Sequence, residues 1–421
     1  MRGSLFKRCI DCGRVVQHKR CGSCGSRRYN WGYAVDIGTG ADGRRRQQRR
    51  NGFETAEEAE RALREVISAI DKQSFVEPSQ LTLGEYLTEH WLPAVRPPQL
   101  RNTTWVEYDR MVRLRMLPEL GQVPLQKLNA AQLNRLYAHL LVDGRADGTG
   151  GLSVKSVRET HVVLRKALED AMRWGMVQRN VAALADPPPA HAAAADRRDT
   201  MAVWSEQQLA RFLRHAQDHD LYPLWALLAS TGMRRSEALG LPWRDVDFDG
   251  KRLSVRQGLV SVDGTPELGP PKSRHAVRTI DLDDRTIAAL RQQRRRQNEQ
   301  RLAAKEWTDT GLVFTRPDGS WLHPDWIGEL FRRLVDEAGL PAIRMHDLRH
   351  THATLLLRWG HNPKVVSERL GHHSVAFTLD TYAHVVPGMQ QAVADEFGNL
   401  LPEVDDGDDN GLGGVPAIVP V

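Results

Sequence analysis

Five short segments in the second half of the 421-residue chain carry side chains that can bind or attack a phosphodiester. Guanidinium groups bind phosphate oxygens through paired hydrogen bonds, amines and imidazoles move protons, and a phenol can act as a nucleophile. Taken alone, each such residue is most often structural, as a solvated arginine, a loop lysine or a core tyrosine. The functional hypothesis therefore rests on all five segments meeting at one place.

Local signals indicate how the first of these groups are presented. A glycine-containing turn places Arg234 at the start of a helix, where Glu237 one turn later can orient its guanidinium. Spacings of three and four residues place His346, Arg349 and His350 on one face of a second helix.

The remaining groups are expected in loops and at a short helix. Lys272 lies in a Gly/Pro-rich hairpin, from which a long amine could reach a leaving oxygen. Gly371 ends a helix that begins at Asn362-Pro363 and releases His372 into a loop. Tyr382 follows ten residues later, on a short helix that Ser374 can cap.

In this order and with these separations, six residues resemble the active site of the tyrosine recombinase family, the lambda-type phage integrases. They are Arg234, Lys272, His346, Arg349, His372 and Tyr382. The resemblance covers residues 203–388 and implies a site-specific DNA recombinase that cleaves and religates strands through a 3′-phosphotyrosine. The implied biological reaction is the integration or excision of a phage or mobile element.

The transition state of such a reaction gathers negative charge on the non-bridging oxygens of the phosphate. We assign Arg234 and Arg349 to these oxygens and give His372 a further hydrogen bond, with Glu237 as an orienting residue. The resemblance makes Tyr382 the nucleophile. Catalysis by this set is expected to need no cofactor.

Two proton transfers accompany that attack. Because a tyrosine is mostly neutral at pH 7, a base is needed, and His346 is the predicted one. The resemblance assigns Lys272 to protonate the departing 5′ oxygen. Three other histidines are interpreted as structural or supporting: His350, His352 and His373. A metal centre in this histidine cluster is disfavoured because no carboxylate set accompanies it and the arginines would repel a cation.

All four cysteines of the chain lie near its beginning, as two Cys-x2-Cys pairs eight residues apart. They are Cys9, Cys12, Cys21 and Cys24. This spacing is typical of a tetrahedral structural zinc site in a ribbon, and a redox dithiol pair is the alternative. Binding DNA, binding protein or bracing the next domain are all open roles for such a ribbon.

A strongly basic stretch follows the cysteines. Two strand-like runs and a helix with a Thr55/Glu58 capping box predict a small α+β domain. It resembles the arm-type DNA-binding domain of the family, which implies a three-stranded sheet packed on one helix. Its candidate DNA-binding residues are Arg44, Arg45, Arg46, Arg49 and Arg50. The alternative is a solvated basic strand.

From about residue 81 the pattern is helical and resembles the family's core-DNA-binding domain. Its candidate DNA contacts are Arg110, Arg113, Lys155, Arg158 and Arg165. The predicted organisation is a zinc-ribbon-like segment (1–28), an arm-type domain (29–75), an all-α core-binding domain (81–186), a linker (187–202), a mixed α/β, mainly helical catalytic domain (203–388) and a C-terminal segment (389–421) with a docking helix and an acidic tail.

The expected partners are double-stranded DNA at core and arm sites, three further copies in a tetramer on DNA, and DNA-bending and directionality factors. No apolar run reaches the roughly 20 residues of a membrane span, so a cytoplasmic, nucleoid-associated bacterial protein is expected. Two other classes stay open: a DNA-binding protein whose catalytic residues are vestigial, and a metal-dependent nuclease.

Overall fold

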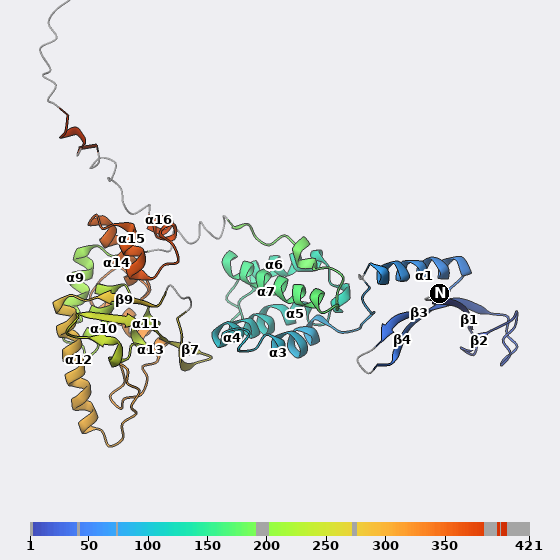
Figure 1. Cartoon of the computed structure of the whole chain (residues 1–421), viewed down its shortest axis with the longest axis horizontal. Coiled ribbons are helices and arrows are strands. Elements are labelled where there is room, and N and C mark those ends of the chain that lie inside the picture. Colours follow the sequence, from blue (N-terminus) through green and yellow to red (C-terminus); the bar gives the residue numbers. More distant parts are fainter. Residues whose placement is uncertain are drawn as a thin grey trace, which may run out of the picture. The chain divides into compact units, whose positions relative to one another are not determined.

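The computed structural model of the chain describes residues 3–39, 43–72, 75–190, 202–271, 276–382, 394–395 and 397–401. These residues belong to two compact units, which divide between Arg198 and Asp199 (Figure 1). None of the helices in the described ranges is long and apolar enough to cross a membrane.

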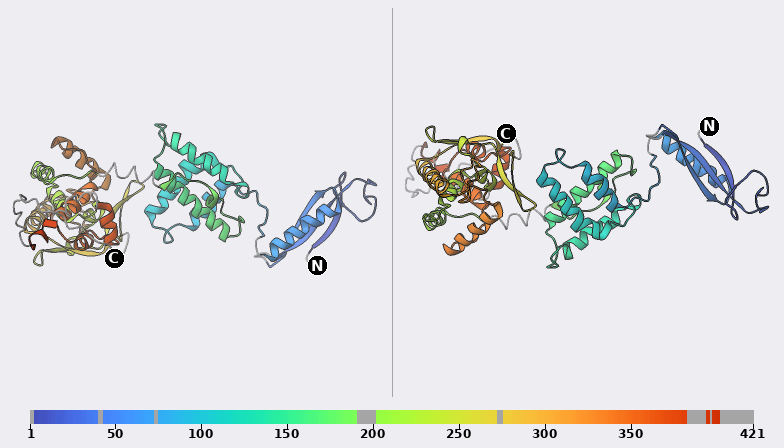
Figure 2. Two further views of the ribbon diagram at one scale, coloured as in Figure 1. Left: turned by 90° about the horizontal axis from the view of Figure 1, so that it is seen from above. Right: turned by 90° about the horizontal axis from the view of Figure 1, so that it is seen from below.

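The first module is an antiparallel sheet with strand order β2-β1-β3-β4 and one helix. Its elements are β1 Gly3–Cys9, β2 Val15–Val16, β3 Tyr29–Thr39, β4 Arg45–Phe53 and α1 Ala56–Asp71. The predicted Thr55/Glu58 capping box is present at the start of α1. Figure 2 shows α1 running along one face of the sheet, where Tyr33 and Val35 pack against Leu63.

Strand pairing joins the segment predicted as a ribbon to the predicted arm domain, which meet at residue 29. Strand β1, which ends at Cys9, pairs with β3 along its whole length, from Gly3 opposite Val35 to Cys9 opposite Tyr29. The cysteine loops therefore extend the same sheet that carries the basic strand. The sequence did not reveal this because strand pairing joins residues that are far apart along the chain.

The second module is a helical bundle. Short π-helical and 3-10-helical segments are labelled η. The elements are α2 Leu83–Glu85, η1 Tyr86–Trp91, α3 Leu92–Ala94, α4 Asn102–Met111, η2 Val112–Met116, α5 Leu117–Leu120, η3 Leu125–Lys127, α6 Ala130–Asp143, α7 Val154–Arg173 and η4 Val181–Leu184. A capping box of Asn129 and Gln132 begins α6. The long α7 buries Val157, Leu164 and Leu168 in the bundle core, which leaves its other face open to solvent.

The third module combines helices with small sheets. Its elements are α9 Glu206–His215, α10 Tyr222–Thr231, α11 Arg235–Leu239, η5 Trp243–Asp245, β5 Val246–Asp247, β6 Arg252–Val255, β7 Gly258–Val262, β8 Thr265–Gly269, β9 Arg278–Asp281, α12 Asp284–Ala303, α13 Pro324–Glu337, α14 Asp347–Arg358, α15 Pro363–Leu370 and α16 Val375–Tyr382. The sheet order is β5-β6-β9, and β7 and β8 form a separate hairpin.

Helix α10 runs through the core of the third module. It is apolar on all sides, and Leu224, Trp225 and Leu227 are fully buried against the neighbouring helices. At its end Gly232 adopts a left-handed conformation, φ 63°, and turns the chain directly into Arg234. The buried helix thus fixes the position from which the first predicted catalytic residue is presented. The structure thus contains a sheet-and-helix module, a helical module and a mixed α/β module, in the order predicted from the sequence.

Candidate active site

The predicted catalytic residues of the third module come from four short segments that the fold brings together. Arg234 precedes α11, Arg349 lies in α14, His372 follows α15, and Tyr382 is the last residue of α16. Figure 1 shows α14, α15 and α16 packed side by side.

Arg349 forms the floor of the site. Only 3% of its surface is exposed, and its guanidinium donates to the carbonyl oxygens of Gly232 at 2.8 Å and Leu370 at 2.7 Å. Burial, followed by the nearby charge of Arg234, lowers the pKa of Arg349 to about 9. Two guanidiniums held near each other with little solvent form a site that favours an anion.

Glu237 connects two cationic groups. Its carboxylate accepts from the Arg234 side chain at 2.6 Å and from Arg278 at 2.9 Å, and it is 5% exposed. Burial alone would raise the pKa of Glu237, but the hydrogen bond and charge of Arg278 and the charge of Arg234 lower it overall. The carboxylate therefore stays ionised and accepts hydrogen bonds from the Arg234 side chain and from its backbone N–H.

Arg278 was missed in the sequence analysis. It is 6% exposed and donates to the carbonyl of Arg369 at 2.7 Å as well as to Glu237. Its position at the start of β9 looks like that of an ordinary strand residue. Nothing local in the sequence indicates that this strand passes beneath α11 and α15.

Tyr382 is buried, with 1% of its surface exposed. Its hydroxyl lies 2.8 Å from Nδ1 of His350, one turn along α14 from His346. Burial raises the pKa of Tyr382 to about 12, although the charge of Arg349 acts in the opposite direction. The phenol is therefore neutral, and the imidazole that contacts it belongs to a residue that the sequence analysis treated as supporting.

The ring of His350 lies between His346 and the phenol of Tyr382. His346 precedes α14 and meets the ring of His350 edge to face, with 5.1 Å between ring centroids. It keeps an exposed edge, yet the surrounding atoms and then the neighbouring His350 lower its pKa to about 4. His346 is a neutral imidazole next to the site.

His372 lies where Gly371, in a left-handed conformation with φ 69°, ends α15. Its Nδ1 lies 2.7 Å from the hydroxyl of Thr378, which is fully buried. Its ring is nearly parallel to that of Tyr382, at 6.4 Å between centroids and 13° between planes. Burial and then the charge of Arg349 lower the pKa of His372 to about 3. When Nδ1 accepts from Thr378, Nε2 carries the hydrogen and can donate.

Two further predictions in this module concern Lys272 and His352. Lys272 lies outside the described residues, three positions after β8 ends at Gly269. His352 is buried with its Nδ1 at 2.9 Å from the carbonyl oxygen of Ala229, and burial lowers its pKa to about 3.

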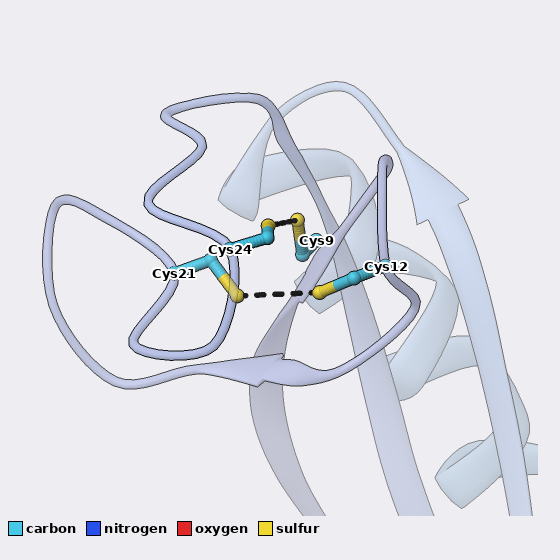
Figure 3. Close-up of side chains that lie close together, drawn as sticks. All are labelled: Cys9, Cys12, Cys21 and Cys24. Atoms are coloured by element: carbon cyan, nitrogen blue, oxygen red, sulfur yellow. Dashed lines mark hydrogen bonds between the residues drawn. The ribbon is translucent and has the colours of Figure 1, made fainter.

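The four cysteines form the one cluster with metal-ligand geometry in the described ranges of the chain. Their sulfur atoms all lie within 4.8 Å of one another, with Cys9 and Cys24 at 3.5 Å and Cys12 and Cys21 at 3.4 Å (Figure 3). Backbone N–H groups of Ser23 and Cys24 lower the pKa of Cys21 to about 6. Four thiolates around a zinc ion at about 2.3 Å would have comparable separations, so the residues fit that ion.

The basic residues of the arm module are divided between two faces of the sheet. Asp36 pairs with Gln47 and Ala34 with Arg49, on the face opposite α1. Arg50 pairs with Tyr33 on the face that α1 covers, and its guanidinium lies 5.4 Å from the ring of Phe53. Two of the predicted contacts form ion pairs: Arg45 with Asp36 at 2.6 Å and Arg46 with Glu77 at 2.7 Å. Arg44 precedes β4.

In the helical module, the candidate contacts on α7 follow one stripe. Lys155, Arg158 and Arg165 recur at spacings of three and seven residues, so they share a face. Arg158 donates to the carbonyl of Pro188, and Lys155 lies 3.7 Å from Glu159. The candidates on the preceding helices are exposed as well: Arg110 and Arg113, the latter paired with Asp109 at 2.8 Å.

Comparison with known families agrees with this division. Residues 203–388 match the phage integrase family, residues 23–70 an arm DNA-binding domain, and residues 82–141 the N-terminal SAM-like domain of phage integrases. The arm match begins inside the cysteine segment, in line with the continuous sheet.

Relatives match over most of the chain. A tyrosine recombinase XerC-like protein of Caldanaerobacter subterraneus subsp. tengcongensis is 26% identical, over 88% of this chain and 96% of the relative. An integrase of Saccharopolyspora erythraea is 24% identical, over 87% of this chain and 93% of the relative. The ICEBs1 integrase of Bacillus subtilis is 27% identical, over 66% of this chain and 72% of the relative.

Solved structures share the fold. The Tn1549 transposon integrase in complex with transposon right end DNA superposes with a TM-score of 0.61 at 22% identity, covering 75% of this chain and 99% of that one. A lambda integrase dimer bound to a core site gives 0.52 at 17% identity, covering 71% and 94%. Three family matches in the expected order, together with a buried tyrosine near the buried Arg349, lead to one conclusion: the chain belongs to the phage integrase family and is a tyrosine recombinase, a site-specific DNA recombinase.

Proposed function

We propose that this recombinase integrates or excises a phage genome or other mobile element, using Tyr382 as the nucleophile that forms the 3′-phosphotyrosine. The observation that carries the proposal is the placement of a buried Tyr382 next to an arginine, Arg349, whose guanidinium is rigidly held by two backbone carbonyls. A preorganised cation of this kind stabilises the charge that develops on an attacked phosphate.

The oxygen atoms of that phosphate are held by three residues. Arg234 is oriented by Glu237, and Arg349 by Gly232 and Leu370, so neither guanidinium needs to reorganise during the reaction. His372 donates from Nε2 because Thr378 accounts for its Nδ1.

Proton transfer completes the cleavage step. The Tyr382 oxygen attacks phosphorus, the bond from phosphorus to the 5′ oxygen breaks, and Lys272 protonates the departing oxygen, while a neighbouring imidazole takes the phenol proton. The phosphotyrosine conserves the bond energy of the strand, so a 5′-hydroxyl from a second duplex reverses the reaction without ATP. Cleavage itself requires no metal ion.

DNA binding is divided between two modules. The face of the arm sheet opposite α1 carries Gln47 and Arg49 beside the small Ala34, a profile that suits entry into a major groove. The basic stripe of α7 serves the core site through contacts with phosphates. Phosphate contacts position the protein, and groove contacts select the sequence.

A structural zinc ion is proposed for the cysteine cluster. The residues that would hold it are Cys9, Cys12, Cys21 and Cys24. Because β1 ends at Cys9 and pairs with β3, an ion at this position would stabilise the end of the DNA-binding sheet. Bracing the arm module is therefore the role that its position supports.

The active assembly is proposed to be a tetramer on two duplexes, served by DNA-bending and directionality factors. A solved lambda integrase is a tetramer bound to a Holliday junction, with a TM-score of 0.51 to this chain. The C-terminal residues Phe397 and Leu400 are 67% and 77% exposed, which supports docking of this segment on a neighbouring copy. The rest of the predicted docking helix lies outside the described residues.

A trapping experiment tests the function. Purified protein is incubated with a nicked duplex spanning the junction between the element and the host chromosome, and a denaturant-stable adduct is sought on a gel. We expect an adduct with the native chain and none with Tyr382→Phe. A vestigial DNA-binding protein would bind the duplex without forming any adduct, and a metal-dependent nuclease would cut it in a way that chelators abolish.

A further inference from the structure

The nucleophile and its nearest imidazole form a contact that the sequence did not indicate. His350 Nδ1 and Tyr382 Oη lie 2.8 Å apart, and the two rings are 5.7 Å apart at their centroids. Tyr382 is the last residue of α16, whereas His350 lies in the first turns of α14. Packing of α16 and α14 around α15 therefore creates the contact.

We propose that His350, rather than His346, is the base that removes the phenol proton of Tyr382 during strand cleavage. This inference rests on the proposed function of Tyr382 as the nucleophile. A general base must lie within about 2.6–3.2 Å of the atom whose proton it takes, and His350 already does so.

The other two imidazoles are less suited to this role. His346 contacts the ring of His350, and no hydrogen bond links it to Tyr382 among the contacts of the described residues. His372 stacks parallel to Tyr382, so its nitrogens lie in a plane beside the phenol, and its Nδ1 is engaged by Thr378. Geometry thus leaves His350 as the imidazole that points a nitrogen at the phenol oxygen.

The surroundings of His350 keep it ready to accept. Burial, together with the charges of Arg349 and Arg344 and against that of Asp347, lowers its pKa, so the ring is neutral at pH 7. With the hydrogen on Nε2, Nδ1 has a free lone pair directed at the phenol. His350 is also half-buried, so bulk water does not replace this contact readily.

The proposed step balances as follows. The O–H bond of Tyr382 breaks and its proton passes to Nδ1 of His350, which becomes an imidazolium. The phenol oxygen forms a bond to phosphorus, the bond from phosphorus to the 5′ oxygen breaks, and that oxygen takes a proton from Lys272. Religation runs in reverse: the imidazolium returns its proton to Tyr382 as the phenol leaves phosphorus.

Two substitutions separate a base from a merely positioning residue. His350→Asn places an amide close to the position of Nδ1, so it can hold the hydroxyl but cannot take a proton. His350→Ala removes both functions. The matched control is His346→Asn, one turn away on the same helix, and Lys272→Ala supplies a variant defective at the leaving oxygen. Binding of the junction duplex and thermal unfolding are measured for each variant to show that it is folded.

The measurement is the single-turnover rate of adduct formation on the junction duplex, with either an ordinary phosphate or a 5′-bridging phosphorothiolate at the cleaved position. A thiolate leaves without a proton, so the sulfur substrate bypasses the acid but still requires the nucleophile to be activated. We expect His350→Asn and His350→Ala to be slower by about 100-fold or more on both substrates, a loss typical of a missing general base. Lys272→Ala should recover on the sulfur substrate.

Three results would overturn the inference. The first is a near-native rate of adduct formation for His350→Asn, and the second is recovery of that rate for His350→Ala on the sulfur substrate. The last is a loss of rate on both substrates that is confined to His346→Asn. The first would reduce His350 to a positioning residue, and the last would return the base to His346. Failure of the proposed function looks different, because then the native chain itself forms no adduct that Tyr382→Phe abolishes.

Discussion

At the scale of single residues, the active site is a set of charges held by backbone carbonyls and one carboxylate. Glu237 lies between two arginines, Arg234 and Arg278, and binds both directly. Because a buried carboxylate without partners would be neutral, the arginines and Glu237 depend on each other for their charged states. A substitution of Glu237 should therefore affect both the stability of the fold and the activity of the site.

Substitution of Glu237 tests this dependence. We expect Glu237→Gln to lower the free energy of unfolding by about 1–3 kcal/mol at pH 7, because two buried guanidinium contacts weaken. Folding lowers the pKa of Glu237 from its ordinary value of about 4.5, so its stabilisation is present above that pH and is lost as pH falls through the lower, folded-state value. The difference between the two proteins should thus shrink below about pH 4.5.

Denaturant titrations of both proteins between pH 7 and about pH 3 measure this effect, because the loss is expected only below about pH 4.5. The control is Glu337→Gln, because Glu337 pairs with Arg333 on the half-exposed surface of α13 and contributes little. A pH-independent difference for Glu237→Gln would contradict the role assigned to its charge.

At the scale of elements, helix ends place the catalytic groups. Gly232 ends α10 and supplies the carbonyl that accepts from Arg349, and Gly371 ends α15 next to His372. Both are left-handed glycines of a kind that the sequence indicates, since helices commonly end at such residues. The capping box of Thr55 and Glu58 was predicted on the same local grounds and is confirmed.

Gly232→Ala should damage both stability and cleavage. A Cβ at this position would lie 2.6 Å from Leu370 and 2.7 Å from His352, in addition to the cost of its positive φ. Gly360→Ala is a matched control, because Gly360 also has a positive φ at a helix end but has open space around it. We expect about 1 kcal/mol of destabilisation for the control and about 1–3 kcal/mol more for Gly232→Ala.

Thermal unfolding and single-turnover cleavage measure these effects. Cleavage should fall sharply only in Gly232→Ala, where the acceptor of Arg349 shifts. Equal losses of stability and of cleavage rate in the two variants would mean that only backbone strain matters at Gly232.

Strand alternation on β4 predicts a second element-scale difference. Arg49 lies on the open face of the arm sheet and Arg50 on the face that α1 covers. Arg49→Ala should reduce discrimination between the arm site and unrelated DNA by about 1–3 kcal/mol, because it removes a groove contact. Arg50→Ala should change the affinity for the arm site and for unrelated DNA by similar amounts, and this change should be smaller than the effect of Arg49→Ala. Competition binding at fixed salt measures both, and a reversed order would place the DNA on the other face.

At the scale of the whole molecule, the cysteine loops and the DNA-binding sheet form one structural unit, while the catalytic residues belong to a separate one. Removal of zinc by a chelator, or Cys21→Ser, should therefore loosen the end of β1 and weaken arm-site binding by about tenfold or more. The single-turnover rate of core-site cleavage should be unchanged. A chelator that slows cleavage with saturating core DNA would contradict this separation of the two modules.

The sequence by itself determined the nature of the active-site chemistry and much of the local structure. Local propensities directly express the spacings within one helix and the capping residues. The order of Arg234, Arg349 and Tyr382 is likewise read from the chain without a structure. The family assignment followed from the same residues and is confirmed.

The tertiary structure alone decided which groups touch. The His350 contact of Tyr382, the Arg278 support of Glu237 and the fusion of the cysteine loops to the arm sheet all join elements distant in sequence. His346 and His350 are one turn apart on one helix face, so spacing cannot say which of them meets the phenol. Only the packing of α16 against its neighbours makes that choice, because a hydrogen bond depends on the position of both partners to within a few tenths of an ångström.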